Sequence, residues 1–153
     1  MSTITAKQRA EKAAAYFKEG YNCSQSVILS FADELELDEK TLAKMGSSFG
    51  GGMGRLREVC GAVSGMFMVY GLLRGYHLPE EDEKKGENYK DIQAIAEEFK
   101  NIHGSIVCRD ILKKPEGKDH PLPEKRTAGY YEARPCERCV YDAATILENF
   151  LRK

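Results

Sequence analysis

Apolar side chains recur at helical spacing in several separate segments, and this pattern constrains the fold more than any other feature of the chain. Residues three or four positions apart share one face of an α-helix. The stripes are Ala10, Ala13, Ala14 and Phe17; Val27, Ile28 and Phe31; Ile92, Ile95, Ala96, Phe99 and Ile102; and Val140, Ala143, Ala144, Leu147 and Leu151. The sequence therefore predicts an all-α fold, a single-domain helical bundle that spans residues 1–153.

Capping residues, glycines and prolines indicate where the helices begin and end. We expect helices over residues 5–18, 23–35, 38–45, 55–76, 79–103, 106–113 and 136–151. A glycine-rich loop at 46–54 is expected to be a flexible connector. An irregular proline-containing loop, with Pro115, Pro121 and Pro123, is expected at 114–133 before the last helix. Residues 66–70 could equally form a buried strand by periodicity alone, and helix is preferred because no hairpin partner is nearby.

Composition excludes several classes of function. Hydrophobic residues make up 42% of the 153 residues, so an ordinary core needs no disulfide staples. The net charge of -1 gives no electrostatic reason to bind nucleic acid or an anionic membrane. No apolar run approaches the ~20 residues of a spanning helix, and residues 1–15 do not resemble a secretory signal. We expect a soluble, cytoplasmic protein, in which cysteines indicate redox or metal chemistry.

Most of the five cysteines fall at or near the start of an expected helix. They are Cys23, Cys60, Cys108, Cys136 and Cys139, and the last two have the spacing Cys-x-x-Cys. The N-terminus of a helix carries partial positive charge, which stabilises a thiolate relative to a thiol. Cysteines that serve only as small apolar filler have no reason to gather at such positions. The pattern therefore indicates sulfur chemistry, either thiol redox or metal ligation.

The Cys-x-x-Cys pair is compatible with three interpretations. In the redox interpretation Cys136 and Cys139 form a disulfide, and Arg134 and Arg138 lower the pKa of Cys136. In the metal interpretation the thiolates hold zinc or an iron–sulfur cluster; the ligands would be Cys23, Cys60, Cys108 and Cys136. In the third, the chain is a helical interaction module and its cysteines are incidental.

Two glycines next to Cys60 lie four positions apart, so on a helix they share one face. Gly61 and Gly65 would let another backbone or a ligand approach closely, and we regard them as candidate cofactor contacts. Glycine inside a helix costs roughly 1 kcal/mol relative to alanine, so each needs a reason. Tight helix packing is the simpler reason. The glycine face would have a functional role if the surface that approaches it carries Cys23, Cys108 or Cys136.

The order Cys23, Cys60-Gly61-Ala62-x-x-Gly65, Cys108 and Cys136 resembles a family of redox-active proteins named for a Cys / Gly-Cys-Ala-x-x-Gly / Cys / Cys pattern. The resemblance runs from about residue 21 to residue 151. Here Cys60 precedes Gly61, whereas the family's name puts glycine first. Either Cys136 or the additional Cys139 could be the family's last cysteine, and we prefer Cys136. The resemblance implies a redox-active or cluster-binding role and brings no substrate.

We therefore predict a thiol-based redox protein, a thiol–disulfide oxidoreductase or electron carrier with an unknown redox partner. Cys60, Cys136 and Cys139 would react, while Cys23 and Cys108 would relay or resolve. A metal or iron–sulfur protein that uses the same cysteines is the alternative. His103, at the end of an expected helix, is explained by the helix dipole alone. Exposed glycine faces would allow helices of two copies to dock, so a homo-oligomer stays open.

Overall fold

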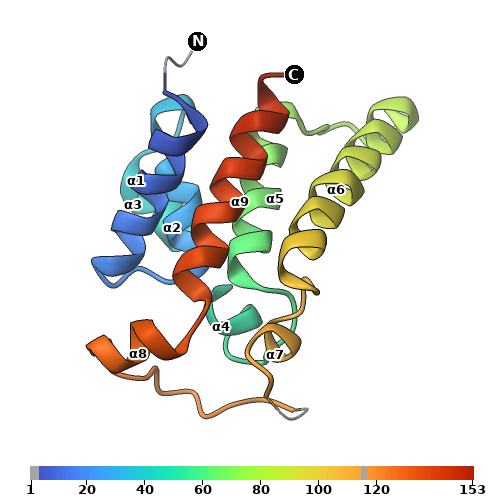
Figure 1. Ribbon diagram of the computed structural model, residues 1–153. Coiled ribbons are helices and arrows are strands. Elements are labelled where there is room, and N and C mark those ends of the chain that lie inside the picture. Colours follow the sequence, from blue (N-terminus) through green and yellow to red (C-terminus); the bar gives the residue numbers. More distant parts are fainter. Residues whose placement is uncertain (1–3, 115–116) are drawn as a thin grey trace.

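The computed structural model describes residues 4–114 and 117–153, and in these ranges the chain is all-α with no β-strand (Figure 1). The predicted fold class is confirmed. In order, the elements are α1 (Ala6–Lys18), α2 (Cys23–Ser30), the 3-10 turn η1 (Ala32–Glu34), α3 (Glu39–Gly46), α4 (Gly50–Met53), α5 (Gly61–Arg74), α6 (Asp82–His103), α7 (Cys108–Ile111), α8 (Ala128–Ala133) and α9 (Cys136–Leu151).

Helix α9 runs through the middle of the bundle and packs against α1, α2, α5 and α6 (Figure 1). Its apolar stripe is buried as its spacing predicts, with Val140, Ala143, Ala144 and Leu147 inaccessible to solvent. Helix α6 contributes Ile95 and Phe99 to the same core. None of the helices in residues 4–114 and 117–153 has the length and apolar character needed to span a membrane.

Side-chain caps fix the starts of the early helices. Thr5 begins α1 and Asn22 begins α2, each in a reciprocal capping box with a glutamine three residues later. Asp38 accepts a hydrogen bond from the backbone N–H of Thr41 and begins α3. Such caps use residues close together in the sequence, which is why these starts could be predicted. The cap at Asn22 matters for function, because it places Cys23 in the first turn of α2.

The predicted central helix over 55–76 begins too early, since α5 starts only at Gly61. Arg55 and Arg57 have left-handed backbone angles, with φ of 64° and 61°, which no helix accommodates. The N–H of Cys60 donates to the carbonyl of Ile106 at 2.8 Å, and that of Cys108 to the carbonyl of Glu58 at 2.6 Å. Together with the antiparallel bridge between Val59 and Val107, these long-range bonds hold residues 58–60 against the segment before α7, whereas residues 54–56 form a turn and a bend. Residues 66–70 are helical, so the strand alternative is wrong.

Other predicted boundaries also shift. The helix expected over 23–35 ends at Ser30 and continues as the 3-10 turn, and the helix expected over 106–113 is the single turn α7. The loop expected at 114–133 is irregular around Pro121 and Pro123 but ends in α8, which is capped by Thr127. Pro115 lies outside the described residues. The glycine segment expected at 46–54 contains the end of α3 and the short turn α4.

A buried ion network ties the two ends of the chain together. The side chain of Arg9 in α1 is inaccessible to solvent and donates to Glu148 of α9 at 2.8 Å. It also donates to the carbonyl of Ser30 at 2.6 Å and to Glu34 at 2.6 Å. Because a buried guanidinium is stable only when its donors are satisfied, this network fixes the register of α1 against α2 and α9.

Candidate functional site

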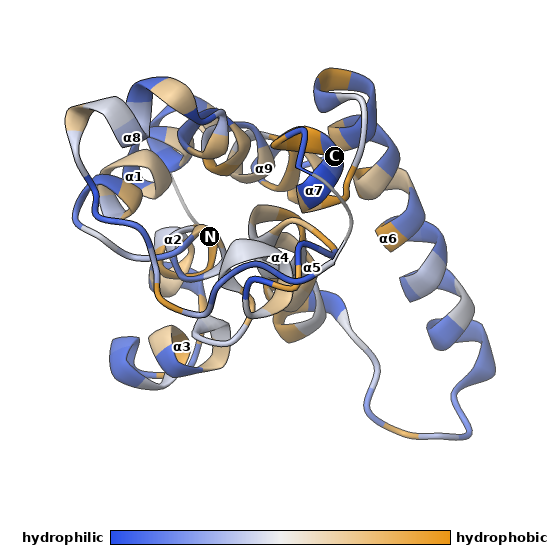
Figure 2. Cartoon of the chain, turned by 90° about the horizontal axis from the view of Figure 1, so that it is seen from below, coloured by the Kyte–Doolittle hydropathy of each residue, from blue (hydrophilic) through white to orange (hydrophobic). Residues whose placement is uncertain are grey.

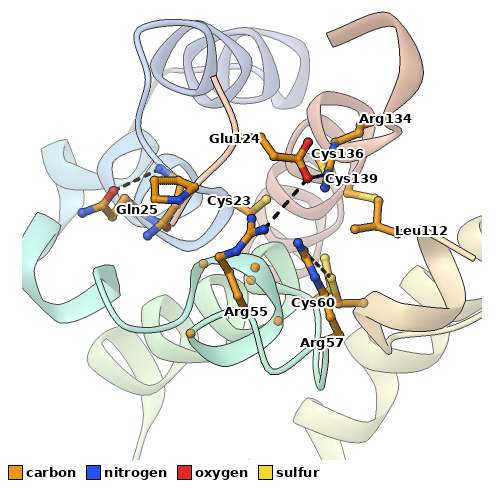
Figure 3. Close-up of a pocket in the computed structure, with 18 of the residues that line it drawn as sticks. Cys23, Gln25, Arg55, Arg57, Cys60, Leu112, Glu124, Arg134, Cys136 and Cys139 are labelled. Carbon is orange, nitrogen blue, oxygen red and sulfur yellow. Dashed lines mark hydrogen bonds and ion pairs between the residues drawn. The ribbon is translucent and has the colours of Figure 1, made fainter. Parts of the chain in front are cut away.

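A cavity of about 550 Å³ lies at the end of the bundle where α2, α5, α7 and α9 begin. All five cysteines line it, together with a ring of polar and arginine side chains (Figure 3). The short helices α4, α7 and α8 lie at this same end of the bundle (Figure 1 and Figure 2). Residues that are far apart in the sequence are therefore neighbours at one site, as the redox and metal interpretations both require.

Helix geometry explains the gathering of the sulfur atoms. Cys23, Cys108 and Cys136 are the first residues of α2, α7 and α9, and Cys60 precedes the first residue of α5. Cys139 lies one turn further along α9. Four of the cysteines thus stand at helix N-termini. The partial positive charge of the longer helices α5 and α9 favours thiolates there.

Gly61 and Gly65 bring α2 and α5 into close contact. A Cβ atom at Gly61 would lie 2.9 Å from the carbonyl oxygen of Phe49 and 3.1 Å from the Cβ of Cys23. A Cβ atom at Gly65 would lie 2.8 Å from the carbonyl oxygen of Ser24. Gly61 lines the cavity, whereas Gly65 packs against Ser24 and Val27 of α2. The approaching surface carries Cys23, so this tight packing places Cys23 beside the start of α5; a cofactor contact at either glycine stays a prediction.

The glycine-rich segment is packed against the site. A Cβ atom at Gly52, whose φ is 70°, would lie 2.5 Å from the Cβ of Cys108. A Cβ atom at Gly50 would lie 2.5 Å from the Cβ of Asn22, the capping residue of α2. These close approaches require glycine. The segment predicted to be a flexible connector thus forms one wall of the cavity.

Cys23 and Cys136 form a thiol pair between α2 and α9. The pKa of Cys136 is lowered to about 7: a hydrogen bond from Cys23 lowers it most, burial opposes this effect, and the guanidinium of Arg134 adds to the lowering. The same hydrogen bond raises the pKa of Cys23, and burial raises it more. The pair therefore holds a thiolate on Cys136 and the proton on Cys23.

Cys60 and Cys139 form a second pair, between α5 and α9. The hydrogen bond from Cys139 lowers the pKa of Cys60, and the backbone N–H groups of Ala62 and Val63 at the start of α5 add to this effect. That hydrogen bond and burial raise the pKa of Cys139. Each cysteine of the Cys-x-x-Cys motif thus contacts a thiol on another helix, a pairing that its spacing did not predict.

Cys108 stands apart from both pairs and contacts an arginine. The Nη1 of Arg57 lies 3.5 Å from its Sγ, and Asp119 holds the other side of this guanidinium at 2.9 Å. Burial raises the pKa of Cys108 more than Arg57 lowers it. Cys108 is therefore held as a neutral thiol beside the two pairs.

A histidine and a carboxylate, both missed by the sequence analysis as parts of the site, lie behind Cys139. The Nδ1 of His103 is 3.8 Å from the Sγ of Cys139, and its Nε2 is 2.9 Å from Asp142. Both side chains are more than nine-tenths buried, with exposed fractions of 9% for His103 and 8% for Asp142. With Asp142 accepting from Nε2–H, Nδ1 is free to accept a proton from Cys139. The helix dipole alone does not account for this arrangement.

Four arginines line the cavity, among them Arg134, which the sequence analysis named beside the Cys-x-x-Cys motif. They are Arg55, Arg57, Arg126 and Arg134, and Glu124 is the single carboxylate among the lining residues. Arg126 and Arg134 lie over the ring of Tyr130, at 5.1 and 4.9 Å from its centroid. Neither their spacing nor their number in the sequence distinguishes them from surface arginines, so only the fold identifies them.

The metal interpretation finds no preformed site in the residues that the structure describes. Among them, no group of three or more His, Cys, Asp or Glu side chains is placed to hold a metal ion. Cys23, Cys60, Cys108 and Cys136 share the cavity without forming such a group. Ligation of zinc or an iron–sulfur cluster by these cysteines stays a prediction.

Comparison with known proteins identifies the family of the chain. No curated protein and no solved structure matches it. A family model described as "Putative redox-active protein (C_GCAxxG_C_C)" matches residues 21–150, a range that contains all five cysteines and both thiol pairs. Because this match covers most of the sequence, the chain belongs to the C_GCAxxG_C_C family of redox-active proteins.

Proposed function

We propose that the protein is a thiol–disulfide redox protein in which Cys136 is the attacking thiolate and Cys23 is the resolving thiol. The observation that carries this proposal is the Cys23–Cys136 pair, in which one proton is shared and the pKa of Cys136 falls to about 7. A thiolate with a pKa near the ambient pH combines high ionisation with good nucleophilicity. The redox role of the family supports the same chemistry.

The proposed reaction uses the Cys23–Cys136 pair. The Cys136 thiolate attacks one sulfur of a disulfide substrate, forms a mixed disulfide and releases the other half as a thiolate. The released thiolate takes the proton of Cys23, and the Cys23 sulfur then attacks the Sγ of Cys136. A Cys23–Cys136 disulfide forms and the second half of the substrate leaves as a thiolate. Two protein thiols have lost two electrons, and the substrate disulfide has gained them.

The second pair can accept this oxidation in turn. The Cys60 thiolate attacks one sulfur of the Cys23–Cys136 disulfide and forms a mixed disulfide with it. Cys139 then attacks the Sγ of Cys60, which leaves Cys23 and Cys136 reduced and forms a Cys60–Cys139 disulfide. Cys139 must lose its proton in this step, and the Nδ1 of His103 at 3.8 Å is the acceptor, held by Asp142. The charges of Cys60 and Cys136 influence each other, as sulfur atoms in a shared cavity should.

The test compares wild-type protein with Cys136→Ser and Cys23→Ser in single-turnover reactions with bis(2-hydroxyethyl) disulfide. Wild-type protein should form an intramolecular disulfide, between Cys23 and Cys136 or, after transfer, between Cys60 and Cys139. In Cys139→Ala the transfer cannot be completed, so the Cys23–Cys136 disulfide should remain, identified by peptide mass mapping. Cys136→Ser should lose the fast phase. Cys23→Ser should accumulate a mixed disulfide on Cys136, because the resolving thiol is missing.

Two results would contradict the proposal. One is a Cys136→Ser variant that reacts at the wild-type rate. The other is a purified protein whose cysteines are occupied by zinc or an iron–sulfur cluster, measured by metal analysis and visible absorption after anaerobic purification, and are unreactive until the metal is removed.

A further inference from the structure

We infer that the substrate of this site is a small disulfide that carries negative charge, an inference that rests on the proposed function. Four guanidinium groups and one carboxylate line the cavity into which Cys136 opens. A cavity of about 550 Å³ has the size of a small-molecule site. A concave site lined by one sign of charge concentrates counter-ions and raises their rate of association.

The positive charge is only partly neutralised. Asp119 contacts Arg55, Arg57 and Lys114, and Glu124 contacts Arg134 at the cavity wall as well as Arg55. Within the described ranges, five cations lie around this opening: Arg55, Arg57, Lys114, Arg134 and Arg126. They face two carboxylates, those of Asp119 and Glu124, and the thiolates proposed at Cys60 and Cys136, so one positive charge remains in excess. The excess is a property of the cavity, because the chain as a whole has a net charge of -1.

Arg126 is the clearest source of this excess. No ion pair among the described residues includes Arg126; its guanidinium instead donates to the carbonyls of Phe17 at 2.9 Å and Tyr21 at 3.1 Å. Its plane lies over the rings of Phe17 and Tyr130. The carbonyls and rings hold the group in place without cancelling its charge. It is therefore a preorganised cation at the rim of the site.

The arginines face the sulfur that reacts. The guanidinium groups of Arg134, Arg57 and Arg126 all act to lower the pKa of Cys136, so the same groups surround the position at which a substrate disulfide would be attacked. Tyr130 lies under both Arg126 and Arg134 and joins them into one cationic wall. Guanidinium groups bind carboxylates through paired hydrogen bonds, which makes a carboxylate-bearing disulfide the best chemical fit.

The experiment uses three disulfides of similar size and different charge: dithiodiglycolate, bis(2-hydroxyethyl) disulfide and cystamine, which are anionic, neutral and cationic. Each rate with the reduced protein is divided by the rate of the same disulfide with dithiothreitol, which removes its intrinsic reactivity. We expect the normalised rate of the anion to exceed that of the neutral disulfide about tenfold at low salt, and cystamine to be slowest. The preference should shrink as salt is added.

Substitutions in the wall should move the ratio of anionic to neutral rates in opposite directions. Arg126→Gln and Arg134→Gln should each lower it about threefold to tenfold, whereas Glu124→Gln should raise it. A change in the pKa of Cys136 affects both rates alike and cancels in the ratio. Arg126→Lys keeps the charge and should retain most of the ratio, and Lys84→Gln on the exposed face of α6 should leave it unchanged.

The results separate this inference from the proposed function. Equal normalised rates for the three disulfides, with a Cys23–Cys136 disulfide still formed, would overturn the inference and leave the thiol chemistry standing. A protein that reacts with none of the three would overturn both. Thermal denaturation of each variant identifies any that has lost its fold. If an arginine variant does not fold, Glu124→Gln still tests the inference, because it removes no guanidinium: a higher ratio of anionic to neutral rates supports the inference, and an unchanged or lower ratio overturns it.

Discussion

The pKa of Cys136 at the start of α9 is lowered by a thiol that donates to it and by nearby guanidinium groups. With a pKa of about 7, about half of this thiol is ionised at neutral pH. We predict that alkylation of Cys136 by iodoacetamide rises with pH to a midpoint near 7 and levels off above it, followed by mass spectrometry of the modified peptide. Below the midpoint the rate should fall about tenfold per pH unit.

Arg134→Gln provides the control for this titration. Because the Arg134 guanidinium lowers the pKa of Cys136, its removal should move the midpoint to higher pH. Removal of the hydrogen-bond donor in Cys23→Ala should move it further, since that bond is the largest cause of the shift. A midpoint near that of an ordinary cysteine in wild-type protein would show that the pair does not hold a thiolate.

Single residues also show how far sequence reasoning reaches. The positions of Cys23 and Cys136 at helix starts could be predicted, because Asn22 and Pro135 lie next to them in the chain. Cys60 and Cys108 were predicted only near the starts of helices that begin later in the structure. The partnership of His103 with Cys139 and Asp142 could not, because it joins α6 to α9 through tertiary packing. The pairing of Cys136 with Cys23 could not be predicted either, because it joins α2 to α9 through tertiary packing. The spacing of Cys136 and Cys139 indicated a pair within one helix instead.

At the scale of elements, the approach of α2 to α5 sets the geometry of the site. We predict that Gly65→Ala lowers the free energy of unfolding by about 1–3 kcal/mol, because the new Cβ would press on the carbonyl oxygen of Ser24 at 2.8 Å. The same substitution should move Cys23 away from the start of α5 and slow its reaction. Urea denaturation and the rate of Cys23–Cys136 disulfide formation measure the two effects.

Gly71 in the same helix is a matched control. It is exposed, and a Cβ atom there would meet nothing within 4 Å. Gly71→Ala should therefore raise the free energy of unfolding by about 0.5–1 kcal/mol, through the higher helix propensity of alanine. Equal effects of the two substitutions would show that contact with α2 is not what Gly65 provides.

Element boundaries were predicted well where local signals decide them and poorly where distant contacts do. The starts of α1, α2 and α3 follow from Thr5, Asn22 and Asp38. Local signals predict a helix in the segment before α5, yet its bonds to residues 106 and 108 hold residues 58–60 outside the helix. This departure has a structural consequence, because the non-helical segment places Arg57 beside Cys108 and forms part of the cavity wall.

At the scale of the whole molecule, the thiol pairs connect helices that are distant in sequence, so the redox state should control global stability. A Cys23–Cys136 disulfide would close a loop of more than about 100 residues, and loops of that length correspond to about 4–5 kcal/mol of lost entropy in the unfolded chain. We predict that oxidation raises the free energy of unfolding by about 2–4 kcal/mol. Urea denaturation with and without dithiothreitol measures the difference.

Two single variants decide which disulfide is responsible. A Cys136–Cys139 disulfide would close a loop within one helical turn and constrain the unfolded chain far less. If the bond joins α2 to α9, Cys139→Ala should keep the stabilisation and Cys23→Ser should lose it. The reverse pattern would restore the local pair that the Cys-x-x-Cys spacing suggests. Stability thus reports the same partnership as the chemistry, because the sulfur atoms that would exchange electrons also join the two ends of the fold.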